Sequence, residues 1–324
     1  MKNVDESVIG SQQTMTPRLP SVRVLFKLTT AYYKEHFHVI ASVMLVPMIL
    51  RLPSIFIHDA IVGIVSSLAS FAAVFLANIV LMGLIVGGWD SKASIGVLYK
   101  KSFGWIWPLI YVQAYILLCT IGGLFLLIIP GIYASIVLIF STYCLLSENS
   151  RGLLALHKSW YLVKGRWGAV FGRILALWLL FMIVGFFFGA VSVGPQLLTM
   201  LKEVARNPDI APKIAFSPFI DLFNMFVQSF VVLPVSVIYM SFMYRALKTI
   251  KATDVVVEGD TKKIEKTINI FMLIGFIGII GTILMSGLFI LKMLTNMGGD
   301  NYVPVFNHAS ISTSIQSFLA NLWK

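Results

Sequence analysis

The chain has 324 residues, of which 58% are hydrophobic and only 12% are charged, against about 25% charged residues in ordinary soluble domains. This composition excludes a soluble globular protein and predicts an all-α, polytopic membrane helical bundle. Lys and Arg number 25 against 14 acidic residues. In so apolar a chain, this excess predicts contact with anionic membrane lipids rather than with nucleic acid.

Runs of about 20 apolar residues, the length that crosses the hydrocarbon core as a helix, define the expected spans. The longest uncharged run, residues 102–147, is about twice that length, and we divide it at Pro130-Gly131 because this pair favours a sharp turn. We predict six core transmembrane helices and a seventh after them. The seven spans are residues 38–57, 60–89, 104–128, 131–146, 173–193, 218–244 and 267–291.

Basic residues are unevenly divided between alternate connecting segments, with 19 in one set, five in the other and Arg51 inside the first span. The positive-inside rule then places the N-terminus in the cytoplasm and the C-terminus outside. We expect a polar cytoplasmic tail at 1–20, a single transmembrane domain at 21–292 and an extracytoplasmic tail at 293–324. Residues 1–20 lack the apolar core of a signal peptide, so the first span is expected to remain uncleaved.

Three short segments before outgoing spans combine an apolar face at helical spacing with Lys and Arg. They are residues 21–37, 91–103 and 150–164, and each is expected to lie as an amphipathic helix in the headgroup layer. The chain therefore reads as three weak repeats of an interfacial helix followed by a membrane hairpin. Residues 245–266 are mixed in charge and are expected to form a loop with short helices, while 196–206 and 311–323 have the spacing of outer surface helices.

The central stretch, residues 128–173, carries the most specific sequence motifs. They are Pro130-Gly131, Glu148, Ala155-Leu156-His157-Lys158-Ser159-Trp160 and Gly165-Arg166-Trp167, in that order. This order resembles the bacterial multi-pass proteins grouped with the membrane domain of glycerophosphoryl diester phosphodiesterase and the related YciC-like inner-membrane proteins. The resemblance implies a bacterial cytoplasmic membrane location and six core helices. It implies no phosphodiesterase activity here, since no segment between spans exceeds about 40 residues.

Polar residues inside a span are costly and often functional, so they provide the first candidate site. Asp221, Asn224 and Gln228 share one face of the sixth predicted span, and they form a candidate polar cavity to which Asn78 and Gln113 are possible additions. The favoured alternative is structural, because a carboxylate in the first helical turn complements the helix dipole and amides bond between helices. For Arg51, in the first span, snorkelling to the interface is favoured over ligand binding.

A basic and aromatic cluster at the predicted cytoplasmic interface provides the second candidate. Lys164, Arg166, Trp167 and Arg173, with Trp160 nearby, are candidate contacts for an anionic lipid headgroup. The favoured alternative is simple anchoring by an aromatic belt and the positive-inside bias.

Other motifs are expected to be structural. Cys119 and Cys144 are interpreted as packing residues, and His36 and His38 have the wrong spacing for a metal site. Small residues at helix-contact spacing predict close packing at Gly83/Gly87, Gly185/Gly189 and Gly278/Thr282/Ser286. No catalytic, cofactor or metal motif is visible.

The leading functional hypothesis is a non-enzymatic inner-membrane protein that engages anionic lipids and acts in envelope organisation or with a membrane protein partner. The alternative is a transporter or lipid-handling protein that uses the polar cavity. A membrane-embedded enzyme of lipid metabolism is a third, weaker possibility, because no catalytic acid or nucleophile is recognisable.

Overall fold

The computed structural model describes residues 19–57, 59–206, 218–251 and 258–297, and all the regular structure in these ranges is helical. The helices are α2 (Val22–Glu35), α3 (Phe37–Phe56), α4 (Ala60–Ile85), α5 (Ile95–Phe103), α6 (Ile106–Leu126), α7 (Ile128–Leu138), α8 (Ser141–Glu148), α9 (Leu153–Val163), α10 (Trp167–Arg206), α11 (Pro218–Val227), the π-helical turn η1 (Gln228–Val232), α12 (Leu233–Lys251) and α13 (Glu258–Met297).

Seven helical stretches in the described residues are long and apolar enough to cross a membrane, which confirms the predicted all-α polytopic fold. They are Phe37–Phe56, Ala60–Ile85, Ile106–Leu126, Ile128–Glu148, Trp167–Gly189, Ile220–Lys251 and Lys262–Met293. Each overlaps one predicted span. Their starts follow local signals: Asp59, for example, caps α4 by accepting hydrogen bonds from the Ile61 and Val62 amides at 2.9 and 3.0 Å.

Several predicted boundaries differ from the structure by a few residues, and three differences change an element. The turn between α6 and α7 lies at Leu127, and Pro130 stands in the first turn of α7, where its missing N–H costs no helical hydrogen bond. α10 continues through Pro195 to Arg206, so the predicted separate helix at 196–206 is part of it. α13 begins at Glu258, so the predicted loop ends in several helical turns. The predicted helix at 311–323 lies outside the described residues.

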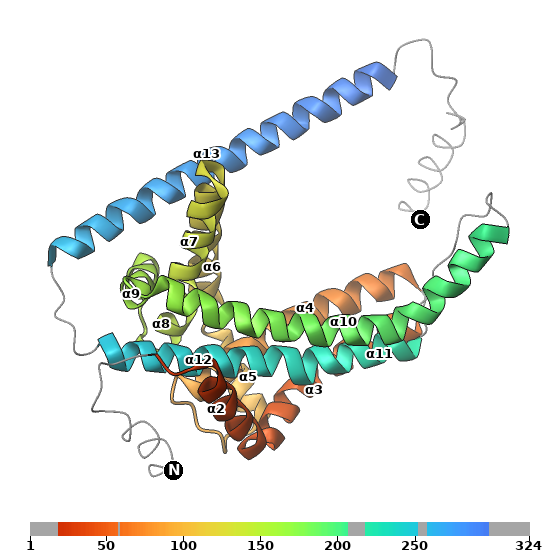
Figure 1. Cartoon of the computed structure of the whole chain (residues 1–324), viewed down its shortest axis with the longest axis horizontal. Helices are drawn as coiled ribbons and strands as arrows, with labels where there is room; N and C mark the ends of the chain where they lie inside the picture. The colour runs from red at the N-terminus through yellow and green to blue at the C-terminus, as the bar shows by residue number, and fades with distance from the viewer. Residues whose placement is uncertain (1–18, 58, 207–217, 252–257, 298–324) are drawn as a thin grey trace, which may run out of the picture.

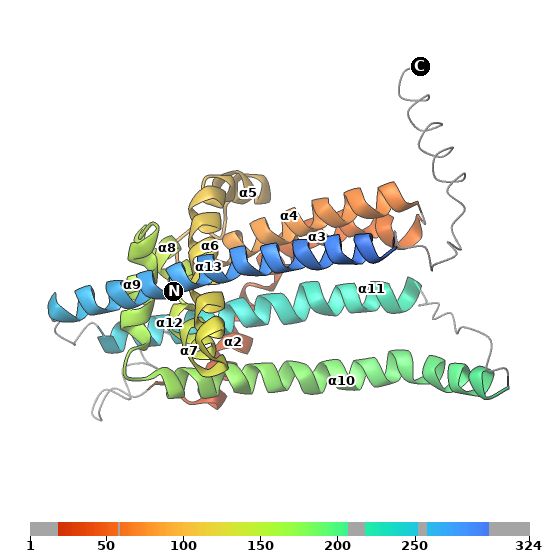
Figure 2. The same cartoon turned by 90° about the horizontal axis from the view of Figure 1, so that it is seen from above.

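Most long helices run along one direction, while one hairpin lies across it. α4, α10 and α12 follow the long axis in both views, and the α6–α7 hairpin crosses this direction (Figures 1 and 2). α2, α5, α8 and α9 gather near one end of these helices, together with the start of α13. We call this the basic end, because most Lys and Arg residues of the described part lie there; the opposite end, where α10 and α13 finish and α11 begins, is the far end.

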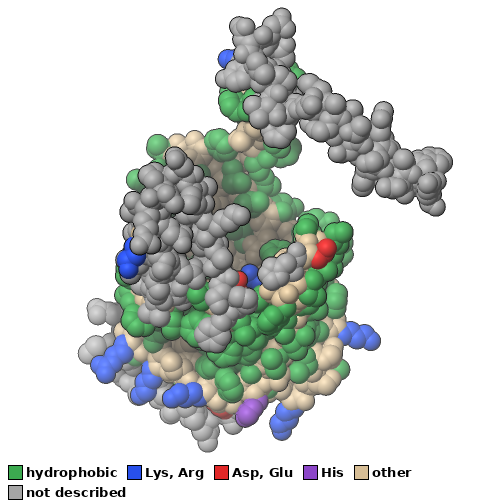
Figure 3. Space-filling view, turned by 90° about the vertical axis from the view of Figure 1, so that its right-hand side faces the viewer, with side chains coloured by type: hydrophobic (Ala, Val, Ile, Leu, Met, Phe, Trp, Pro, Cys, Tyr) green, Lys and Arg blue, Asp and Glu red, His purple; other side chains and the backbone are tan. Residues whose placement is uncertain are grey.

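The core lies where α4, α8, α9 and α12 meet, and it includes the fully buried side chains of Phe140, Leu145, Tyr239 and Tyr244. The flanks are apolar and exposed, with Ile61, Phe71 and Phe186 all more than 70% accessible. From the far end, hydrophobic side chains dominate the surface and most of the visible Lys and Arg lie along the lower rim (Figure 3). Such flanks suit contact with acyl chains.

Glycines bring α13 against α6. A Cβ on Gly275 would overlap the Leu118 carbonyl oxygen, and a Cβ on Gly122 would overlap that of Phe271, so the two backbones touch. Only part of the predicted small-residue contacts occurs. Gly278 faces the Phe125 ring, but Thr282 and Ser286 are exposed, Gly83 and Gly87 pack on Trp89 of the same segment, and Gly185 and Gly189 meet nothing within 4 Å among the described residues.

Candidate lipid-facing site at the basic end

Three short amphipathic helices, α2, α5 and α9, form the candidate site, and we call them the collar. Each is seated by the apolar face that its sequence predicts. Leu25 and Thr29 of α2 are fully buried, as are Leu156 and Val163 of α9, while Leu98 of α5 is 2% exposed. The three helices are therefore fixed parts of the fold.

α2 is held by a hydrogen bond to a carbonyl that a proline has freed. Pro234 has no N–H, so it cannot donate to the carbonyl oxygen of Phe230, four residues earlier. The Tyr33 hydroxyl of α2 donates to that oxygen at 2.5 Å. An unpaired carbonyl at membrane depth costs several kcal/mol, so Tyr33 both satisfies the break and fastens α2 beside α12.

α5 is attached to α3 in the same way, by a tyrosine hydroxyl that donates to a carbonyl oxygen freed by a proline. Pro47 lies inside α3 and leaves the Val43 carbonyl oxygen without its helical donor. The Tyr99 hydroxyl donates to it at 2.8 Å. A further hydroxyl, that of Ser70 in α4, donates to the carbonyl oxygen of Pro47 itself at 2.9 Å. Pro47, one of the two prolines in α3, is thus supported from two sides.

α9 satisfies a break between α7 and α8. Helical geometry stops at Ile139-Phe140, and the fully buried Ser159 hydroxyl bonds to both sides of the gap. It donates to the Val137 carbonyl oxygen at 2.7 Å and accepts from the Phe140 amide at 3.1 Å. One side chain therefore supplies an acceptor to the start of α8 and a donor to the end of α7.

These three attachments form a closed cycle through the predicted repeats. The first repeat comprises α2, α3 and α4, the second α5 to α8, and the third α9 to α12. Tyr33 joins the first repeat to the third, Tyr99 joins the second to the first, and Ser159 joins the third to the second. Each collar helix is consequently tied to a membrane helix of another repeat.

An ion-paired network lies beside the third attachment. The Glu148 carboxylate accepts Lys158 Nζ at 2.7 Å and Lys248 Nζ at 2.8 Å, and the Tyr244 hydroxyl donates to it at 3.2 Å. Lys158 also donates to Ser150 Oγ at 2.7 Å. This network joins α8, α9 and α12. Two of its members, Glu148 and Lys158, belong to the sequence motif of residues 128–173.

His157 of the same motif faces a drier environment. Its Nε2 atom is buried and has no hydrogen-bond partner among the described residues. Burial lowers the pKa of His157, and the negative charge of Glu265 on α13 opposes this effect.

The solvent-facing side of the collar is basic. Arg23, Lys27 and Lys34 of α2 are exposed, as is Lys100 of α5. The neighbouring Lys101 places Nζ 4.6 Å from the centre of the Trp89 ring. Two collar helices, α2 and α5, therefore present cations outward, whereas the one cation of α9, Lys158, is paired with Glu148.

The structure divides the predicted lipid-contact cluster. Trp167 packs edge-on against Tyr133 and is 44% exposed, and Lys164 and Arg166 are half-buried beside it. Arg173 lies further along α10 and is engaged by backbone: it donates to the carbonyl oxygens of Pro20, Leu19 and Ala169 at 2.8, 2.9 and 2.6 Å. Arg173 thus anchors the chain before α2.

The predicted polar stripe lies on the surface. Asp221, Asn224 and Gln228 are all exposed, and Gln228 opens the π-helical turn η1. Asn78 donates to the Val74 carbonyl oxygen of its own helix at 3.0 Å, and Gln113 is exposed. Two surface depressions in the described part, one along α13 and one between α2, α3 and α4, are lined by other residues.

Sequence reasoning missed Tyr33, Tyr99 and Ser159 as attachment points. The prolines signal which carbonyls are freed, but nothing in the sequence indicates which distant hydroxyl satisfies each one. Cys119 and Cys144 are free and fully buried, as expected of packing residues.

Comparisons with protein-family models, with curated proteins and with solved structures find no match for this chain.

Proposed function

We propose that this chain is a non-enzymatic, multi-pass protein whose collar binds anionic lipids, and that it acts in envelope organisation or with a membrane protein partner. The observation that carries the proposal is the construction of the collar. Three amphipathic helices are fastened by hydroxyl groups to membrane helices, and exposed Lys and Arg lie on the outer side of two of them, α2 and α5. Helices of this type bind the headgroup layer through apolar burial and attraction to anionic lipids.

The same proposal gives the orientation and the location. The basic end faces the cytoplasm, following the positive-inside bias, and the membrane is the bacterial cytoplasmic membrane implied by the family resemblance. The proposed relationship to that family is supported by the structural roles of the motif residues. Glu148, Lys158 and Ser159 hold three helices together, and Trp160 packs edge-on against Tyr133, so the motif has a structural purpose that a family without a shared catalytic activity would retain.

The test compares lipid retention in two variants with the same change in net charge. The collar variant replaces Arg23, Lys27, Lys34 and Lys100 by Gln, and the control variant replaces Arg51, Lys202, Arg206 and Lys292 by Gln. Each protein is reconstituted in nanodiscs containing phosphatidylglycerol and phosphatidylcholine, and retained lipids are identified by native mass spectrometry after gentle release.

A basic residue near an anionic surface contributes about 1 kcal/mol, so we expect roughly a tenfold or greater loss of retained phosphatidylglycerol in the collar variant. The control variant should retain as much as the unmodified chain. Equal retention in the collar variant and the unmodified chain would contradict the proposal.

The transport alternative depends on a polar cavity around Asp221, Asn224 and Gln228. Their exposed positions provide no observation in its favour. It remains a prediction from sequence, and uptake that is abolished by Asp221→Asn would be the evidence for it.

A further inference from the structure

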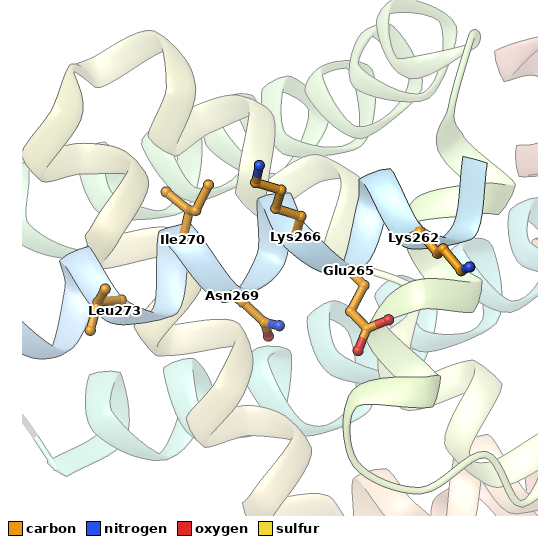
Figure 4. A pocket seen from close by; sticks show the side chains of 6 residues that line it. All are labelled: Lys262, Glu265, Lys266, Asn269, Ile270 and Leu273. Carbon is orange, nitrogen blue, oxygen red and sulfur yellow. The ribbon is translucent and has the colours of Figure 1, made fainter. Parts of the chain in front are cut away.

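α13 carries a second candidate site, separate from the collar. Six of its residues line a shallow depression near the basic end: Lys262, Glu265, Lys266, Asn269, Ile270 and Leu273. Their spacing of three and four residues places them on one face of the helix (Figure 4). The first four are polar and the last two are apolar, so the lining of the depression passes from polar to apolar along the helix.

The polar groups are arranged by charge across this face. In Figure 4 Glu265 and Asn269 lie along one edge, Lys266 lies on the opposite edge, and Lys262 is at the end nearest the start of α13. All four are exposed and make no side-chain hydrogen bond or ion pair with another described residue, although the charge of Glu265 also acts on His157 of α9. Two cations, one carboxylate and one amide therefore remain available to a ligand.

The depression also lies at the right depth for a lipid. The last charged residue before the uncharged part of this candidate span is Lys266, and Ile270 and Leu273 follow within it at 45% and 60% exposure. Eleven residues of helix cover about 16 Å, enough to reach from the headgroup layer into the acyl region. A lipid lying along α13 would meet the polar residues first and the apolar ones next.

We propose that this face binds a phospholipid whose headgroup carries both a phosphate and a primary ammonium group, as phosphatidylethanolamine does. Lys262 and Lys266 bind the phosphate, Glu265 and the amide oxygen of Asn269 accept hydrogen bonds from the ammonium, and Ile270 and Leu273 contact the start of an acyl chain.

The residue types distinguish this headgroup from two others. A choline group has no N–H to donate to Glu265, and the depression has no aromatic lining for a quaternary ammonium. A headgroup with a phosphate and no cation would leave Glu265 unpaired beside a negative charge. The site therefore selects for the primary ammonium.

The test uses nanodiscs with equal amounts of phosphatidylethanolamine, phosphatidylcholine and phosphatidylglycerol, and native mass spectrometry of the retained lipids. We expect the unmodified chain to retain phosphatidylethanolamine over phosphatidylcholine. Glu265→Gln should lower retained phosphatidylethanolamine at least about fivefold without changing phosphatidylglycerol, because only the ammonium partner is lost. Lys262→Gln with Lys266→Gln should also lower it. Lys263→Gln is the matched control, since Lys263 lies outside the depression.

The outcomes separate this inference from the proposed function. The collar variant should lose phosphatidylglycerol and keep phosphatidylethanolamine, whereas Glu265→Gln should do the reverse. Unchanged phosphatidylethanolamine retention in Glu265→Gln, or equal retention of the ethanolamine and choline lipids by the unmodified chain, would overturn the inference.

Discussion

α12 and α13 follow one another in the chain, yet they are held in opposite ways. In an apolar stretch of 18 residues within the span Ile220–Lys251, which includes α12, 44% of the residues are buried, against 11% in such a stretch within α13. Pro234, in the first turn of α12, interrupts the hydrogen bonds between η1 and α12, and the Tyr33 hydroxyl donates to the Phe230 carbonyl oxygen at this junction. α13 contains no proline, and its main contact is the glycine crossing with α6.

The freed carbonyl explains why α12 has α2 attached to it, but it does not explain burial in general, since α4 contains no proline and 44% of its apolar stretch is also buried. A broken helix in a membrane must find partners for its freed carbonyls, and those partners have to come from packed neighbours. An unbroken helix satisfies its own backbone and can present side chains to lipid on most of its surface. The candidate lipid site on α13 and the attachment of α2 on α12 are two results of this one requirement.

The largest effect is expected from a substitution that separates α13 from α6 and so removes the main contact of α13. In Gly275→Leu the new side chain would collide with the backbone at Leu118, and overpacking of this kind costs about 1–3 kcal/mol or more. We expect the largest loss of stability among the variants here, measured as the midpoint of thermal unfolding in detergent. Gly281→Leu on the same helix, where nothing among the described residues lies within 4 Å, should be nearly neutral. Equal effects of the two substitutions would contradict the crossing.

Ser159→Ala removes both hydrogen bonds at the break between α7 and α8. Leaving a buried donor and a buried acceptor unpaired costs about 1–3 kcal/mol each, offset in part by local relaxation. We expect a clear fall in the unfolding midpoint. Ser135→Ala is the control, because Ser135 is half-buried rather than fully buried and its hydroxyl bonds only to its own helix. If Ser159→Ala were as stable as this control, the two hydrogen bonds of Ser159 would not stabilise the junction between α7 and α8.

Tyr33→Phe and Tyr99→Phe each delete one hydroxyl and leave the ring in place. Each leaves a carbonyl oxygen without its donor and should lower the free energy of unfolding by about 1–3 kcal/mol, the usual cost of an unsatisfied buried acceptor. Since the two carbonyls lie on different helices, the effects should add in the double variant. Tyr111→Phe, at an exposed position of α6, should change nothing measurable. Wild-type stability in the double variant would mean that the freed carbonyls have other partners.

The smallest expected effect is a pH dependence from His157. Its pKa lies below the ordinary value of about 6.5, so the unfolded chain takes up a proton before the folded chain does. Stability should therefore fall as the pH drops below about 6.5, and no contribution is expected well above that pH. Comparing unfolding midpoints from about pH 8 to about pH 5 tests this, because His157→Gln should flatten the curve.

The sequence predicts the local elements better than their partners. Apolar run length locates all seven candidate spans, and helical spacing identifies the buried faces of α2, α5 and α9, because these properties depend on neighbours in the chain. The crosswise α6–α7 hairpin and the three hydroxyl attachments depend on contacts between distant segments. The bond from Tyr33 to Phe230, for example, joins residues 197 positions apart, and no periodicity encodes that pairing.

The candidate sites show the same limit. Asp221, Asn224 and Gln228 share a helix face as predicted from their spacing, but spacing does not say what that face meets, and it meets the exterior. Arg173 was grouped with Lys164 and Arg166 by its charge, although backbone carbonyls near Pro20 engage its guanidinium. Residue type suggested the chemistry in both cases, and the tertiary environment decided its use.

The central claim, that the collar is the surface where the protein meets anionic lipid, is tested most directly by hydrogen–deuterium exchange in nanodiscs with and without phosphatidylglycerol. The account predicts slower amide exchange in α2, α5 and α9 when the anionic lipid is present, with no change at the far ends of α10 and α13. Identical exchange of the three collar helices in both lipid compositions would contradict it.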